Sequence, residues 1–118
     1  MNSVLKKKKL LSVVVLFWNN SDKTIKCLDS IFKQTGIQFE LVLVDNNSEI
    51  KYQKEIFKWL KQNKIKVNQV NKTSDKITNS SNKKICHYVK NKVNYGCGLG
   101  HNFGYKVCLK NNFKFIAR

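Results

Sequence analysis

The stretch Leu41-Val-Leu-Val-Asp-Asn-Asn-Ser48 decides the fold, because it joins an uninterrupted apolar run to a polar turn. Such a run is typical of a strand that is buried on both faces of a sheet. We predict this strand over Phe39 to Val44, and a second buried strand over the valine-rich run Leu10 to Phe17. Asparagines follow both runs and end them.

A helical pattern follows each of these strands. After the first strand, Ser21 is placed to cap a helix that ends near Gly36, and a second helix begins after Ser48. Apolar residues recur three and four positions apart in the two helices, at Ile25, Leu28, Ile31 and Phe32 and then at Tyr52, Ile56, Trp59 and Leu60. Alternating strands and helices with short connections predict a parallel sheet built from right-handed crossovers.

The second half of the chain continues this alternation after a polar insertion at about residues 63–84. Within the insertion, Ile65 to Val70 alternates and predicts a short edge strand. Two more strands are predicted, over Ile85 to Val89 and over Phe113 to Ala117, with a glycine-opened helix between them. We therefore predict an α/β fold with three layers, in which a mostly parallel, Rossmann-like sheet has helices on both faces. Residues 1–118 form a single domain, which we expect to be incomplete because it stops inside a strand.

Composition and charge limit the classes of protein that the chain can belong to. A hydrophobic content of 42% excludes a disordered chain, and the longest apolar run, Leu10 to Trp18, is too short for the roughly 20 residues of a membrane span. The net charge is +16, supplied by 22 lysines and the single arginine Arg118. Two interpretations of the lysines stay open, an AT-rich coding bias or attraction to nucleic acid or an anionic membrane. The scarcity of arginine disfavours sequence-specific DNA binding.

The four cysteines contain no Cys-x-x-Cys pair, and a chain with this core needs no disulfide, so we expect a reducing cytoplasm. Cys27 and Cys108 lie beside apolar helical positions, where we expect their thiols to pack as small apolar groups. We predict no metal site, because no common zinc motif matches the spacing of the four residues that could form one, Cys86, His87, Cys97 and His101.

Two features at the predicted carboxyl edge of the sheet could bind a ligand, and each has a structural alternative. Asp45 could accept hydrogen bonds from ring N–H or ribose hydroxyl groups, or could serve only in a turn before the second helix. The run from Asn94 to Gly104 holds four of the five glycines. Its backbone could approach a phosphate at a helix N-terminus, or could form a tight turn and a packed crossing. The run departs from the dinucleotide fingerprint, which disfavours a Rossmann dehydrogenase.

Four segments, in this order, resemble the start of a family-two glycosyltransferase of the GT-A fold: residues 11–20 (LSVVVLFWNN), 27–35 (CLDSIFKQT), 41–48 (LVLVDNNS) and 94–104 (NYGCGLGHNFG). The resemblance covers nearly the whole chain except the polar insertion. It implies that Asp45 contacts the base of a nucleotide-sugar donor and that Asn19 and Asn20 line the same pocket. It also implies that the glycine-rich segment closes over the nucleotide through Asn94, Gly96, Gly98, Gly100, His101 and Asn102.

The resemblance also sets expectations about partners and catalysis. The family's metal-binding Asp-x-Asp motif would follow the last predicted strand, so we expect no catalytic residue, metal ligand or cofactor in these residues and no transfer by the chain alone. A full-length relative is expected to use Mg or Mn. The expected donor is a UDP-sugar, and the expected acceptor is a cell-surface glycan or a lipid-linked molecule at the cytoplasmic face of the inner membrane. Peripheral contact with anionic lipid is expected there, and specific nucleic acid binding is not.

An alternative from a different class is a small basic module that binds RNA or an anionic membrane surface without catalysis. Its stacking platforms would be the aromatic residues near lysines, Trp18, Trp59, Tyr88 and Tyr95. We expect Trp59 in the core and Trp18 at the end of a buried strand, which disfavours this alternative.

Overall fold

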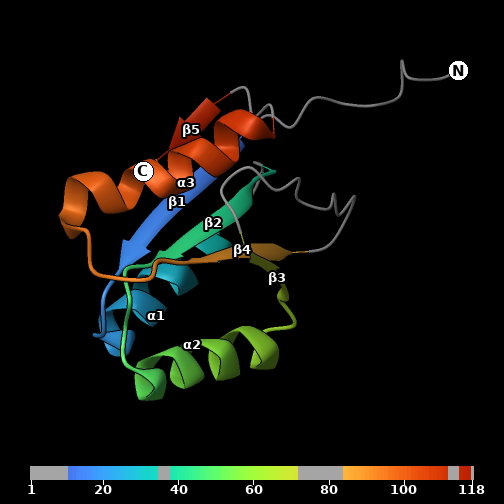
Figure 1. Ribbon diagram of the computed structural model, residues 1–118. Helices are drawn as coiled ribbons and strands as arrows, with labels where there is room; N and C mark the ends of the chain where they lie inside the picture. Colours follow the sequence, from blue (N-terminus) through green and yellow to red (C-terminus); the bar gives the residue numbers. More distant parts are fainter. Residues whose placement is uncertain (1–10, 35–37, 72–83, 112–114, 118) are drawn as a thin grey trace, which may run out of the picture.

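The computed structural model of the protein describes residues 11–34, 38–71, 84–111 and 115–117 (Figure 1). These residues form five strands, β1 (Leu11–Phe17), β2 (Glu40–Asp45), β3 (Lys66–Val70), β4 (Ile85–Lys90) and β5 (Phe115–Ala117). They also form three helices, α1 (Ser21–Phe32), α2 (Ile50–Gln62) and α3 (Gly96–Lys110). The strands make one sheet in the order β3-β4-β2-β1-β5, and every neighbouring pair is parallel.

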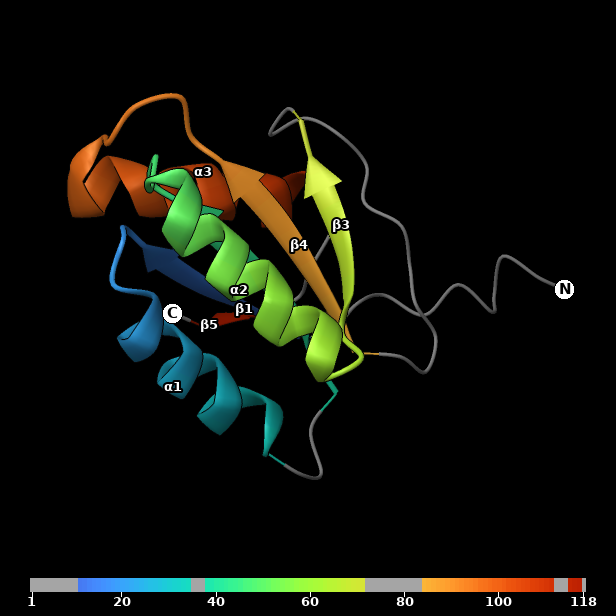
Figure 2. The ribbon, with the colours of Figure 1, turned by 90° about the horizontal axis from the view of Figure 1, so that it is seen from below.

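Helices cover both faces of the sheet, which gives three layers (Figures 1 and 2). The α1 and α2 helices lie on one face, where their apolar residues pack against Leu41 and Leu43 of β2. The α3 helix lies on the other face, where Val107 packs with Val42 and Val44 of the same strand. Alternate residues of β2 therefore pack into two cores, one on each face of the sheet. This explains why its apolar run is uninterrupted. The predicted fold class is confirmed.

All five strands end at the same edge of the sheet because they are parallel. The register places Phe17 of β1 beside Asp45 of β2, and Asp45 beside Lys90 of β4. The β1–α1 turn, the β2–α2 turn and the β4–α3 segment therefore leave the sheet next to one another. Open parallel sheets bind their ligands at this carboxyl edge.

The polar insertion begins as part of the sheet. The edge strand predicted over Ile65 to Val70 is β3, which pairs with β4. Residues 72–83 of the insertion lie outside the described residues, as do the predicted boundary positions Leu10, Gly36 and Phe113. The last strand is observed from Phe115 onward.

The start of α1 differs from the prediction by one residue. Asn20, not Ser21, occupies the N-cap position, and its backbone is left-handed with a φ of 39°. The Asn20 carbonyl accepts the first helical hydrogen bond from the Thr24 amide at 3.2 Å, so Ser21 is already helical. The Ser21 hydroxyl donates instead to the carboxylate of Glu55, which joins α1 to α2. The prediction of Ser21 as the cap was therefore wrong, because a neighbouring helix offered its hydroxyl a stronger acceptor.

Close packing of α3 explains two of the four glycines in its sequence. A β-carbon at Gly104 would lie 2.6 Å from Val14 Cγ1 and 2.9 Å from Val44 Cγ2. A β-carbon at Gly100 would lie 2.9 Å from Leu16 Cδ1. Both glycines therefore let the helix backbone approach β1 and β2 more closely than an alanine would allow.

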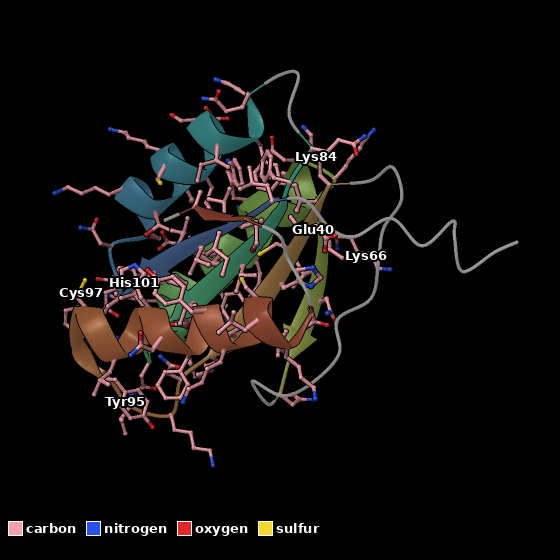
Figure 3. The ribbon with its side chains drawn as sticks, turned by 90° about the horizontal axis from the view of Figure 1, so that it is seen from above. Glu40, Lys66, Lys84, Tyr95, Cys97 and His101 are labelled. Carbon is pink, nitrogen blue, oxygen red and sulfur yellow. The ribbon has the colours of Figure 1, made fainter. Side chains whose placement is uncertain are left out.

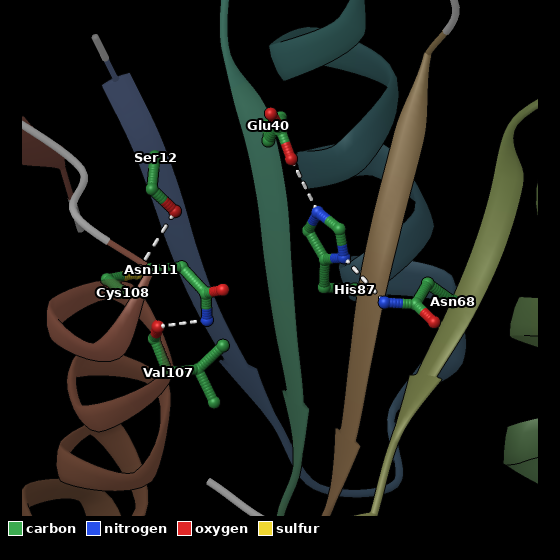
Figure 4. A network of polar contacts seen from close by, with 7 residues as sticks. All are labelled: Ser12, Glu40, Asn68, His87, Val107, Cys108 and Asn111. Carbon is green, nitrogen blue, oxygen red and sulfur yellow. Dashed lines mark hydrogen bonds and ion pairs between the residues drawn. The ribbon is translucent and has the colours of Figure 1, made fainter. Parts of the chain in front are cut away.

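Polar side chains also pair on the α3 face of the sheet, beside α3 itself and across β2, β4 and β3 (Figure 4). His87 is fully buried, with Nε2 2.6 Å from Oε1 of Glu40 and Nδ1 3.1 Å from Nδ2 of Asn68. On the same face, the Cys108 thiol donates to the hydroxyl of Ser12 at 3.1 Å. Glu40 is the first residue of β2, so these contacts lie at the amino end and support the core, away from the carboxyl edge.

Candidate functional site

Hydrogen bonds between the first two loops of the carboxyl edge fix their relative positions. The Asn19 amide donates to the Ser48 hydroxyl at 2.7 Å, and the Glu49 amide donates to Asn19 Oδ1 at 2.9 Å. Asn19 and Asn20 both have positive φ values, of 52° and 39°, which asparagine tolerates better than most residues. Asn19 thus joins the β1–α1 turn to the loop that follows Asp45, while the Asn20 carbonyl accepts from Thr24 within α1.

Asn46 joins the same loop to the glycine-rich segment. Its amide nitrogen donates to Asn94 Oδ1 at 2.8 Å and to the Gly96 carbonyl at 3.2 Å. Its amide oxygen accepts hydrogen bonds from Asn91 Nδ2 at 3.1 Å and from the Tyr95 amide at 3.0 Å. Both ends of one buried side chain therefore hold the β4–α3 segment against β2. Sequence reasoning missed this residue, although it lies directly after Asp45 in the polar turn.

Asp45 is fully buried, and both of its carboxylate oxygens accept hydrogen bonds from within the chain. Oδ1 accepts from the Ser48 amide at 2.7 Å, and Oδ2 accepts from the Tyr88 hydroxyl at 2.5 Å. Burial and the neighbouring carboxylate raise the pKa of Tyr88 far above its ordinary value, so its hydroxyl stays a donor. These contacts are those of a turn residue, which is the structural alternative that the sequence left open for Asp45. A contact between Asp45 and a ligand stays a prediction.

The predicted site residues of the glycine-rich segment fall into two groups. Asn94, Gly96, Gly98 and Asn102 are exposed, and a β-carbon at Gly98 would meet nothing within 4 Å. Position 96 requires a glycine, because its φ of +79° is one that residues with a side chain rarely adopt. Gly100 is buried against β1, so the structure gives it a packing function, and the partly buried His101 places Nδ1 2.8 Å from the Cys97 carbonyl oxygen. Figure 3 shows Cys97, His101 and Tyr95 at the same end of α3, far from Glu40.

The aromatic side chains near this edge differ in their exposure. Trp18 is 54% exposed, so its predicted burial is wrong: it lies one residue beyond the end of β1, where the sheet no longer covers it. Tyr95 is 36% exposed, and its ring packs 4.8 Å from that of Phe103. Tyr88 is buried between Phe17 and Phe57 and offers no stacking surface.

Hollows lie near both ends of the sheet on the described surface. One of about 330 Å³ lies beside the carboxyl end of β4 and is lined by Asn71, Val89, Lys90, Asn91, Lys92, Tyr95 and Phe103. None of the predicted site residues lines it. The other, of about 190 Å³, includes Leu11 and Phe39 at the amino ends of β1 and β2. The hydrogen bonds among the three polar loops therefore define the candidate site.

Among the residues that the structure describes, no three His, Cys, Asp or Glu side chains gather as metal ligands. The one carboxylate at the centre of the edge, Asp45, is already occupied by internal donors. A divalent metal therefore does not fit these residues. Cys86 is buried, which raises the pKa of its thiol and keeps it unreactive, whereas Cys27 is exposed and its predicted packing is wrong.

A parallel α/β sheet whose carboxyl edge carries three hydrogen-bonded polar loops is the arrangement of ligand-binding doubly wound domains. The family model described as glycosyl transferase family 2 matches residues 12–113. The chain belongs to glycosyl transferase family 2.

One similar curated protein is the uncharacterized protein MT1568 of Mycobacterium tuberculosis (strain CDC 1551 / Oshkosh). The two are 44% identical over 46 residues, which is 39% of this chain and 14% of that protein. The chain thus aligns with a small part of its relative's length. In the described part of the chain, we find no helix with the length and apolarity to cross a membrane.

Proposed function

We propose that this chain forms the nucleotide-sugar-binding part of a glycosyltransferase. The nucleotide, a UDP-sugar, would bind at the carboxyl edge between the β1–α1 turn, the loop that begins at Asp45 and the glycine-rich segment. The transferred hexose would go to a cell-surface glycan or a lipid-linked acceptor. Family membership supports glycosyl transfer in general.

The observation that carries this proposal is the contact of Asn46 with Asn94 and Gly96. It holds the N-terminus of α3 beside the end of β2. The Gly96 amide donates to Asn94 Oδ1 at 2.8 Å, and the exposed residues Cys97 and Gly98 supply the other amides of the first helical turn at this edge. Amides at a helix N-terminus attract phosphate oxygens, and the exposed ring of Trp18 offers a face on which a base can stack. A nucleoside diphosphate supplies both groups.

We further propose that the 118-residue chain does not transfer sugar by itself. Inverting transfer needs a carboxylate base and a group that neutralises the leaving diphosphate. The described acids include none that is placed for both tasks, and no step through a metal follows from these residues. The nucleotide-binding residues would therefore orient the donor, and the chemistry would depend on residues beyond this part of the fold.

Calorimetric titration with UDP tests the proposal, with Gly98→Ala as the informative variant. The added methyl group enters open space and leaves the fold intact, so it interferes only with a ligand that approaches the backbone there. We expect the affinity for UDP to fall about tenfold or more, the effect of a crowded contact. Leu109→Ala, at the exposed far end of the same helix, is the matched control and should bind UDP as the parent does.

Absence of UDP binding by the folded parent chain would refute the proposal. So would equal UDP affinity in the parent and Gly98→Ala, because the ligand would then lie away from the glycine-rich segment. A parallel titration with single-stranded RNA separates this function from the non-catalytic RNA-binding alternative, which predicts the tighter complex with RNA.

A further inference from the structure

The outer side of α2 carries a row of four lysines, Lys51, Lys54, Lys58 and Lys61, which we call the α2 lysine stripe. They are spaced three and four residues apart, so they lie on one side of the helix, and all four are exposed. The opposite side packs on the sheet through Gln53, Ile56 and Leu60. Figure 2 shows α2 on the outside of the molecule along its whole length. The stripe therefore faces solvent over about 15 Å, at 1.5 Å per residue.

The positive charge of the stripe is not neutralised within the described residues. The single acid of α2 is Glu55, and its carboxylate accepts the Ser21 hydroxyl of α1, which turns it toward that helix. No ion pair in the described ranges involves a stripe lysine. Lys51 contacts a π face instead, 4.8 Å from the ring centroid of Tyr52.

The neighbouring helix shows that the stripe is a local feature. The α1 helix lies on the same face of the sheet but carries two lysines and two aspartates, so its charges balance. Asp29 of α1 also forms an ion pair with Lys33, at 2.8 Å. Of these two helices on one face of the sheet, α2 thus carries four lysines against one acid, whereas the charges of α1 balance.

We propose that the α2 lysine stripe is a docking surface for an anionic lipid bilayer. Lysines near such a surface are attracted by its negative potential, and their apolar stems can lie along the headgroup region. Ile50, 64% exposed at the N-terminal end of the stripe, adds an aliphatic group that can enter the boundary between headgroups and acyl chains. The proposal concerns a surface separate from the nucleotide loops.

A bilayer suits this surface better than RNA does. Proteins that bind single strands combine basic grooves with exposed aromatic rings on which bases stack. The aromatic residues of α2, Tyr52, Phe57 and Trp59, are all partly buried, and the large exposed apolar residue beside the stripe is an isoleucine. The stripe is also the outer side of one straight helix, which matches a flat surface.

Vesicle sedimentation tests the proposal with two matched double variants of the full chain. Lys54→Gln with Lys58→Gln removes an i, i+4 pair from the stripe, and Lys106→Gln with Lys110→Gln removes an i, i+4 pair from α3 on the other face of the sheet. Both variants lose the same net charge. On vesicles of equal parts phosphatidylglycerol and phosphatidylcholine, we expect the α2 variant to bind about tenfold or more weakly and the α3 variant less than threefold more weakly.

Equal losses in the two double variants would overturn the proposal, because attraction would then depend only on net charge. Binding to pure phosphatidylcholine vesicles as strong as binding to the mixed vesicles would also overturn it. A homopolymeric RNA that binds more tightly than the vesicles and displaces them through the same lysines would show RNA as the occupant. Ile50→Ser should weaken binding to the mixed vesicles a few-fold, and an unchanged affinity would remove Ile50 from the docking surface.

Discussion

Asp45 joins two parts of the chain that are distant in sequence, because its carboxylate accepts from Ser48 in its own turn and from Tyr88 in β4. Sequence reasoning left two functions open for this residue, ligand contact and turn formation. Its position after an apolar run was visible in the sequence, but its burial was not. The Tyr88 hydroxyl reaches this carboxylate only because β2 and β4 pair, with Lys90 opposite Asp45 and Tyr88 opposite Leu43. The turn function is therefore observed, and the ligand function is still to be tested.

We expect Asp45→Ala to lower the free energy of unfolding by about 2–4 kcal/mol, because it leaves two buried donors without an acceptor. Tyr88→Phe should cost about 1–2 kcal/mol, since one donor to a charged group is lost. The double variant should lose less stability than the sum of the two single losses. The Tyr88 hydroxyl that Asp45→Ala leaves without an acceptor is absent from the double variant. Urea denaturation of all four proteins measures this coupling.

A stability loss below about 1 kcal/mol in Asp45→Ala, together with a tenfold loss of UDP affinity, would contradict this expectation. The carboxylate would then turn outward to the ligand in the bound state. Additive losses in the double variant would show that the contact with Tyr88 contributes little.

At the scale of elements, the helix α3 shows how much of the glycine-rich segment is structural. The sequence predicts a helix opened by glycines, which is observed, and leaves its glycines with two interpretations. The structure separates them residue by residue: Gly100 and Gly104 pack against strands, and Gly98 faces open space. Glycine spacing alone could not make this distinction, because it depends on which side of the helix faces β1.

We expect Gly104→Ala to lower the free energy of unfolding by about 1–3 kcal/mol, because its methyl group would overlap Val14 and Val44. Gly98→Ala is the matched control in the same helix. It should leave stability unchanged or raise it by about 0.5 kcal/mol, since alanine favours a helix over glycine. Thermal unfolding of both variants checks the difference, and equal effects would show that α3 can move away from the sheet at no cost.

Other element-level features were predictable for an identifiable reason. A near-continuous apolar run predicted β1, an uninterrupted one predicted β2, and an alternating run predicted β3 despite its polar surroundings. The N-cap residue of α1 and the exposure of Trp18 were not predictable, because both depend on tertiary contacts. The Ser21 hydroxyl donates to Glu55 of α2, and the Trp18 indole lies beyond the last paired residue of β1. Asn46 was missed because asparagine is common in this chain and its partners lie more than 40 residues away.

At the scale of the whole molecule, a net charge of +16 acts against a compact state. We expect added sodium chloride to raise the stability by roughly 1 kcal/mol between low and high salt, or about 5 °C in Tm, because salt screens repulsion between exposed lysines. The double variant Lys54→Gln with Lys58→Gln should be more stable than the parent at low salt and should respond less to salt. A Tm that falls as salt is added would mean that attractive ion pairs outweigh the repulsion.

The pairing of β1 with β5 determines the order in which the fold can form. Leu11 pairs with Phe115, so this contact closes almost the entire chain into a loop, whereas β2 pairs with strands much nearer in sequence. Contacts between distant residues form late because the entropy of loop closure opposes them. The strand β5, described over Phe115–Ala117, makes its described ladder contacts with β1, so we expect it to join β1 late and to exchange its amide hydrogens before β2 does. The carboxyl edge formed by the three polar loops would then be in place before β5 pairs with β1.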